Sequence, residues 1–181
     1  RTGDSNIYAI GDVSTGPMLA HKASSQGKFV AEIISGNQVK EEALVPSVIF
    51  ADPEIAIVGL YEQKAKDDGI KVITGKFPFS VSSRAMTKNE TDGFVKIIAD
   101  AKNDTVVGMQ IVGHGASDLI SEAALAIKMK LSLEDLASTI HPHPTLSESL
   151  MEVAEATAIA AEIRKESRGA HARNDFEDAA D

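Results

Sequence analysis

The order of the strand-like and helix-like segments after Val45 constrains the fold most strongly. Short runs of strand length, rich in Val, Ile and Phe, come first, at 48–50, 55–58, 72–79, 93–99 and 106–112. One short helical pattern, at 60–68, interrupts them, and longer ones follow at 116–129 and 147–164, with a short helix capped by Ser132 between these two. Strands first and helices later are typical of an α+β domain, in which helices back an antiparallel sheet. Pro78 excludes a central position for the strand 72–79, because proline cannot donate a ladder hydrogen bond.

Residues 1–44 have a different pattern. The apolar run 7–10 has the length of a strand and ends at Gly11-Asp12, and a helical pattern opens at Pro17 and ends at Gly36. We expect a β-turn-α unit followed by a polar linker at 37–44. An Asp at the end of a strand and beside a helix N-terminus lies where α/β folds bind nucleotides, but a plain β-turn-α unit has the same pattern.

The composition narrows the classes of function. The formal net charge of -9 argues against a nucleic-acid surface, which needs clustered Lys and Arg, and the apolar runs are too short to span a membrane. The chain contains no cysteine, so the residues given provide neither thiol chemistry nor thiolate metal ligands. It carries no start Met, signal peptide or transit segment, and we expect it to begin in the middle of a fold.

The stretch from His141 to Glu148 is the leading candidate for chemistry. It holds two imidazoles, two prolines and a carboxylate within eight residues, and the prolines restrict the backbone around His143. A titratable ring on a stiff loop suits proton transfer, and Glu148 can reach back to hold one ring nitrogen. The alternative is a helix-capping loop in which Thr145 or Ser147 is the cap. We expect no metal site at the two histidines, since the prolines fix their ring directions and no further ligand is evident.

Two segments resemble parts of one enzyme family. The pattern His141-x-His143-Pro144-Thr145-Leu146-x-Glu148 resembles the C-terminal signature of dihydrolipoamide dehydrogenases, which are pyridine nucleotide-disulfide oxidoreductases. Residues 9–13 and 16–23 resemble the second flavin-binding segment of the same enzymes. Shorter matches lie between them in the family's order, at Pro46, Asp52-Pro53-Glu54, Val58-Gly59, Phe77-Pro78-Phe79, Arg84-Ala85 and Asp92-Gly93. Glutathione reductases share a His-Pro-Thr-x-x-Glu core and remain an alternative.

The resemblance implies a fold and a set of site residues. Residues 1–44 would be the last β-α segment of an FAD-binding domain, and residues 45–165 the interface domain through which two subunits form a homodimer. His143 would be the acid–base residue, oriented by Glu148 and delivered to the active site of the other subunit. The expected flavin-binding residues are Asp12 at the ribityl chain and, along the isoalloxazine, Met18, Leu19, Ala20 and His21.

The resemblance also implies a reaction. The full-length enzyme would oxidise dihydrolipoamide to lipoamide and pass electrons through a redox-active disulfide and FAD to NAD. Its partner would be the lipoyl domain of a 2-oxo acid dehydrogenase complex, in the cytoplasm or, in a eukaryote, the mitochondrial matrix. The cysteine pair and the NAD domain are expected outside this chain, which should be inactive by itself. The alternative from another class is a dimerisation module without enzymatic activity.

The tail at 166–181 departs from this family. Residues 165–176 are similar to a C-terminal segment of succinate dehydrogenase and fumarate reductase flavoproteins, which suggests a junction near Arg164. The composition of the tail, with Gly, Arg, Asn and Asp and little apolar content, favours disorder.

Overall fold

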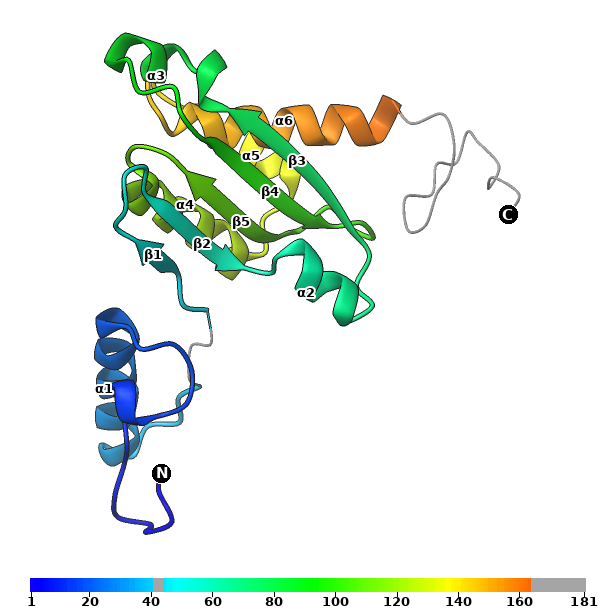
Figure 1. The fold of residues 1–181 in the computed structure, drawn as a ribbon. Helices are drawn as coiled ribbons and strands as arrows, with labels where there is room; N and C mark the ends of the chain where they lie inside the picture. Colours follow the sequence, from blue (N-terminus) through cyan, green and yellow to red (C-terminus); the bar gives the residue numbers. More distant parts are fainter. Residues whose placement is uncertain (41–43, 164–181) are drawn as a thin grey trace. The chain divides into compact units, whose positions relative to one another are not determined.

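The computed structural model describes residues 1–40 and 44–163. The chain divides into two compact units, Arg1–Val45 and a second that begins at Pro46, and each is described by itself. The first unit contains a 3-10 turn, η1 (Gly11–Val13), and one long helix, α1 (Ala20–Ile34) (Figure 1). The tail predicted to be foreign to the family lies outside the described residues. No helix within the described ranges is long and apolar enough to cross a membrane.

The strand predicted for residues 7–10 is not formed. Ile10 has extended dihedral angles, φ -133° and ψ 164°, but the described part of the first unit offers no second strand to pair with it. A strand needs a partner to satisfy its backbone N–H and C=O groups, so the run stays an extended segment. The helix also begins at Ala20 and not at Pro17, after a loop in which Gly16 has a φ of +99°.

The second unit is built on one five-stranded antiparallel sheet. The strands are β1 (Ser47–Ile49), β2 (Ile55–Gly59), β3 (Val72–Pro78), β4 (Phe94–Asp100) and β5 (Val106–Val112), and their order in the sheet is β1-β2-β5-β4-β3. Pro78 therefore lies at the end of an edge strand, which confirms the expectation from its missing N–H.

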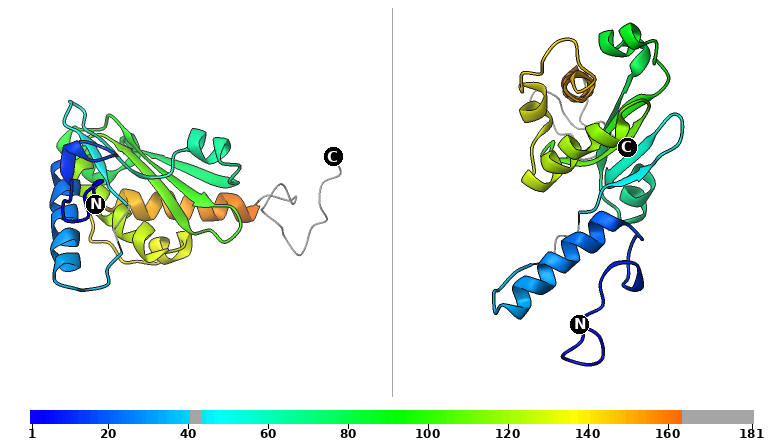
Figure 2. Two further views of the ribbon diagram at one scale, coloured as in Figure 1. Left: turned by 90° about the horizontal axis from the view of Figure 1, so that it is seen from below. Right: turned by 90° about the vertical axis from the view of Figure 1, so that its left-hand side faces the viewer.

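Helices cover one face of this sheet (Figures 1 and 2). Helix α4 (Ala116–Met129) packs on β2 and β5, α6 (Glu148–Ile163) packs on β3 and β4, and the short α5 (Leu133–Ala137) packs beside α6. The α+β prediction is confirmed. The core is mainly aliphatic, and its largest fully buried side chains are Phe79, Ile97, Ile98, Met109, Ile111, Leu133 and Leu150.

Three shorter elements complete the unit. Helix α2 (Glu62–Asp67) falls inside the predicted range, whereas η2 (Phe79–Val81) and α3 (Ser83–Lys88) were not predicted. The α3 helix has six residues and buries only Ala85, so it leaves no hydrophobic period in the sequence. Its only local signal is Ser82, whose hydroxyl accepts the N–H of Ala85 at the helix N-terminus.

Candidate acid–base site

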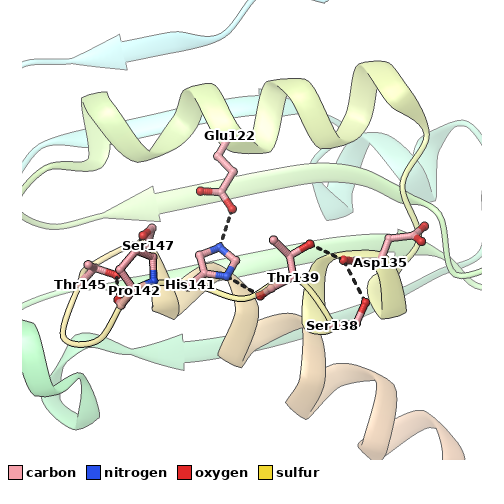
Figure 3. A network of polar contacts seen from close by, with 8 residues as sticks. All are labelled: Glu122, Asp135, Ser138, Thr139, His141, Pro142, Thr145 and Ser147. Carbon is pink, nitrogen blue, oxygen red and sulfur yellow. Dashed lines mark hydrogen bonds and ion pairs between the residues drawn. The ribbon is translucent and has the colours of Figure 1, made fainter.

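The candidate site lies on the loop that joins α5 to α6. The start of α5 is fixed by a capping box, in which the Ser132 hydroxyl accepts the N–H of Asp135 and the Asp135 carboxylate accepts the N–H of Ser132. The end of α5 is tied to the loop by the Thr139 hydroxyl, which donates to the carbonyl of Asp135 at 2.7 Å (Figure 3). Glu148 is the first residue of α6. The loop is thus held at both ends by helices that pack together.

His143 and Glu148 are brought together as the sequence predicts. Nδ1 of His143 lies 2.8 Å from one carboxylate oxygen of Glu148. The other carboxylate oxygen accepts the backbone N–H of Thr145 at 2.6 Å, and the Thr145 hydroxyl donates to the carbonyl of Pro142 at 2.7 Å. The Thr145 contacts close the loop around His143, so the carboxylate cannot turn away from the ring without losing a second hydrogen bond.

The two partners differ in exposure. The His143 side chain is 69% exposed, whereas that of Glu148 is 18% exposed. Among the described residues nothing hydrogen-bonds Nε2 of His143, and the side chain that carries this nitrogen is largely exposed. The pKa of Glu148 is lowered, mainly by the hydrogen bond from the N–H of Thr145 and further by the contact with His143. Burial of the carboxylate has the opposite, smaller effect on this pKa. The carboxylate therefore stays ionised and orients the ring.

A small hollow of about 80 Å³ lies beside the pair. The hydroxyl of Ser149 is buried next to it and has no hydrogen-bond partner among the described residues. The hollow is far smaller than a substrate pocket. The described residues thus form only a small hollow beside the histidine. The residues that line the hollow besides the pair are Phe77, Val81, Ser82, Ser83, Ser149 and Glu152.

His141 does not share this site. Its side chain is only 5% exposed, and its Nε2 lies 2.8 Å from a carboxylate oxygen of Glu122 on α4 (Figure 3). The ring is thus packed into the loop. The two histidines contact different carboxylates, and no cluster of three or more potential metal ligands occurs within residues 1–40 and 44–163.

The expected flavin-binding residues lie on η1 and at the N-terminus of α1. Asp12 is exposed in η1, Met18 is 75% exposed before the helix, and Leu19 is the N-cap residue. Ala20 and His21 open the helix and are exposed. The N-cap residue Leu19 makes no side-chain hydrogen bond to the first turn of this helix.

Two residues that shape this loop were missed in the sequence. The side-chain carbonyl of Gln26 accepts the N–H of Gly11 at 2.8 Å and the hydroxyl of Ser14 at 3.1 Å. The ammonium group of Lys22, which is 5% exposed, donates to the carbonyl of Thr15 at 3.0 Å. Their spacing of four residues puts both on one face of α1, and this polar pair inside a helical pattern was the available signal.

Comparison with known proteins identifies the family. A family model described as "Pyridine nucleotide-disulphide oxidoreductase, dimerisation domain" matches residues 45–154, and one described as "Fumarate reductase flavoprotein C-term" matches residues 136–181. The second range includes residues 165–176, which resembled a C-terminal segment of fumarate reductase flavoproteins in the sequence.

Curated relatives and solved structures agree with the first match. The dihydrolipoyl dehydrogenases of Geobacillus stearothermophilus and Halobacterium salinarum are each 51% identical over 156 residues, which cover 86% of this chain and 33% of those proteins. The crystal structure of LpdA from Mycobacterium tuberculosis matches with a TM-score of 0.81 at 32% identity, over 86% of this chain and 34% of that one. The HOCl-induced flavoprotein disulfide reductase RclA from Escherichia coli matches with a TM-score of 0.77 at 25% identity, over 83% of this chain and 35% of that one.

The chain thus spans about a third of the length of the curated relatives it matches. The matched family range ends inside α6 and contains the whole loop with His143 and Glu148. From the sheet, the loop and these matches, the chain belongs to the pyridine nucleotide-disulphide oxidoreductase family and contains its dimerisation domain.

Proposed function

We propose that this chain is the C-terminal part of a dihydrolipoyl dehydrogenase and supplies the acid–base residue of that enzyme. The observation that carries the proposal is the pair of His143 and Glu148, in which the carboxylate holds Nδ1 and leaves Nε2 exposed. The identity of about one half to curated dihydrolipoyl dehydrogenases supports this choice over a glutathione reductase.

In the proposed reaction Nε2 of His143 accepts a proton from one thiol of dihydrolipoamide. The resulting thiolate attacks one sulfur of a disulfide in the rest of the enzyme, which breaks the S–S bond and forms a mixed disulfide. The second dihydrolipoamide thiol gives its proton to the cysteine thiolate that was released in the first step. Its thiolate then attacks the mixed disulfide, which releases lipoamide and leaves one cysteine as a thiol and the other as a thiolate, with the first proton on His143. Glu148 stabilises the imidazolium that forms on His143. The chain has no cysteine, so the disulfide belongs to residues outside it.

The first unit would contribute to a flavin site. FAD, when bound, would take the two electrons from the reduced cysteines and pass them to NAD. The exposed carboxylate of Asp12 fits a ligand with hydroxyl donors, and Met18, Leu19, Ala20 and His21 at the N-terminus of α1 would lie along its ring system. Gln26 and Lys22 would hold the η1 loop in place for this contact.

A homodimer would complete the site, with the second subunit bringing the disulfide to His143. The register of the sheet supports a partner on the face away from α4 and α6. One cross-strand row on that face consists of apolar side chains that stay partly or largely exposed, namely Ile49, Ile55, Val112 and Phe94. Such a row is a candidate for burial against a second copy. The lipoyl domain of a 2-oxo acid dehydrogenase complex is the proposed substrate carrier.

The second candidate is a dimerisation module with no activity of its own. The absence of cysteine from the chain favours this description of the isolated 181 residues. Size-exclusion chromatography and absorbance in the flavin band test it directly. We expect a colourless dimer, and a yellow preparation that oxidises dihydrolipoamide would contradict the assignment of the chain as part of a larger enzyme.

The base assignment needs an enzyme with the missing parts. A suitable one is a chimera in which this chain replaces the matching third of the Geobacillus stearothermophilus dihydrolipoyl dehydrogenase. In this chimera His143→Gln should lower lipoamide turnover by roughly 10²–10⁴-fold, the usual contribution of a general base. NADH oxidation by dyes, which needs no thiol deprotonation, should be preserved. Equal loss of both activities would refute the role of His143 as the base.

A further inference from the structure

The ring of His141 is bonded at both nitrogens. Nδ1 lies 2.8 Å from the carbonyl oxygen of Thr139, and Nε2 lies 2.8 Å from a carboxylate oxygen of Glu122 (Figure 3). A carbonyl and a carboxylate can only accept hydrogen bonds, so both ring nitrogens must donate. His141 is therefore an imidazolium when both contacts are made.

This ion pair joins the loop to α4 through charged side chains. Glu122 lies 19 residues before His141, on a helix that packs on β2 and β5. The neighbouring Ile140 is 94% exposed, whereas the His141 side chain is 5% exposed and Glu122 is 35% exposed. Burial of the ring between largely exposed loop residues shows that the contact is built into the packing of the loop.

The other hydrogen bonds of the loop within the described residues are local. Thr139 binds back to Asp135 of α5, and Thr145 closes the turn onto Pro142 and Glu148. These hydrogen bonds set the shape of the loop and connect it to α5 and α6, but none of them reaches α4 directly. His143 lies two residues from His141, so the direction of its free Nε2 depends on where the His141 ring is held.

We propose that His141 is a positioning residue, which fixes the loop to Glu122 of α4 and so sets the direction of the Nε2 atom of His143. The inference rests on the proposed acid–base role of His143. It assigns a function to His141, which makes no hydrogen bond with His143 or Glu148 among the described residues.

The pair also makes the positioning dependent on pH. The groups that face the ring are Glu122 of α4 and Glu148 of α6. Burial is the largest single influence and opposes the charged ring, but the contacts with Glu122 and Thr139 outweigh it and raise the pKa of His141. A neutral ring can donate from only one nitrogen, so one of the two contacts is lost as the pH rises through this raised pKa.

Kinetics in the chimera test the proposal. Glu122→Ala should lower kcat for lipoamide by about 10- to 100-fold with little change in KM, because a base displaced by about 1 Å loses catalysis and not binding. Dye reduction should be unchanged. Glu122→Gln keeps an acceptor for Nε2 and should restore most of kcat. It removes the negative charge, however, and should move the alkaline fall in kcat to lower pH. Asp118→Asn, which removes an exposed charge from the same helix, should match the parent chimera.

The outcomes separate the two proposals. If His143→Gln abolishes lipoamide turnover while Glu122→Ala leaves kcat and the pH profile unchanged, the positioning role is wrong and the base assignment stands. If His143→Gln has no effect, the proposed function itself is wrong. Should Glu122→Ala fail to fold, the pH profile of Glu122→Gln decides, and a profile identical to the parent overturns the inference. Nitrogen NMR on the 181-residue chain should show both ring nitrogens of His141 protonated at neutral pH, and a singly protonated ring would contradict the pairing.

Discussion

One carboxylate oxygen of Glu148 lies 2.8 Å from Nδ1 of His143, across the junction of the loop and α6. The contact leaves the exposed side of the ring free, and the helix that provides the carboxylate packs on β3 and β4. The orientation of the His143 ring is therefore fixed by a helix of the domain core, although the ring itself is largely exposed to solvent.

Replacement of Glu148 should weaken the proposed catalysis without removing the base. In the chimera, Glu148→Gln should lower lipoamide turnover by about 10²-fold or less, because a positioned carboxylate contributes orientation and charge but not the proton acceptor itself. Steady-state kinetics with dihydrolipoamide measure the loss. Glu155→Gln, an exposed position of the same helix, is the control. Unchanged turnover in Glu148→Gln would show that the contact between His143 and Glu148 does not contribute to catalysis.

Acid should weaken the folded state through Glu148. Its pKa is lowered below the ordinary value of 4.5, first by the N–H of Thr145 and also by His143, although burial opposes the shift. A group with a lowered native pKa contributes stability above its unfolded value and loses it as the pH falls through the native pKa. Urea unfolding of the 181-residue chain between pH 6 and pH 3 should show a smaller acid-induced loss in Glu148→Gln. A parallel loss in both proteins would contradict this prediction.

The contribution of His141 to stability should depend on pH in the opposite direction, and should be lost as the pH rises. Its pKa is raised above 6.5, so its contribution to stability is complete below that value and disappears as the pH rises through the native pKa. Between pH 6 and pH 9 the free energy of unfolding of the parent chain should fall more than that of His141→Asn, whose amide does not titrate. Equal slopes in the two proteins would show that the ring does not gain its proton on folding.

Gly75 sets how closely β3 approaches α6. A Cβ atom at this position would lie 1.7 Å from the hydroxyl oxygen of Thr157 and 3.0 Å from its Cβ. Thr157 is buried and donates to the carbonyl of Val153, so it cannot move out of the way. Gly75→Ala should destabilise the domain by about 1–3 kcal/mol, the cost of overpacking.

A double-mutant cycle checks the cause of that loss. Thr157→Ala removes the hydroxyl that the new methyl group would meet, so the double variant should be more stable than the sum of the two single effects predicts. Thermal or urea unfolding measures all four proteins. Strict additivity would mean that the cost of Gly75→Ala arises elsewhere in the strand.

The stability contributed by the capping box at the start of α5 should also be measurable by thermal or urea unfolding. Ser132→Ala removes the acceptor for the N–H of Asp135 and should cost about 1 kcal/mol of stability. Ser138→Ala, at the other end of α5, loses only a long 3.4 Å contact with the carbonyl of Asp135 and is the matched control. Equal effects of the two substitutions would rule out a specific role of the cap.

Sequence periodicity predicted most of the second unit. Helix α4 lies at the predicted residues, because its apolar side chains recur at the helical period and Lys130, with a positive φ of 56°, ends it. The five strands were recognised from short β-branched runs, and Pro78 placed β3 at an edge. Helix α3 was missed, since six residues with one buried Ala carry no period. The strand predicted at 7–10 failed because pairing needs a partner, which no local pattern reports.

In the candidate site, too, some features follow from the sequence and others only from the tertiary structure. The sequence by itself determined that an imidazole and a carboxylate stand five residues apart on a proline-restricted loop, since that proximity is local. Tertiary structure decided the strand order, the tie between His141 and Glu122, and the contacts of Gln26 and Lys22 with the η1 loop. These contacts join helices and loops that are distant in the sequence or differ in period. They form only when the elements pack, because packing fixes which polar atoms meet and which remain free.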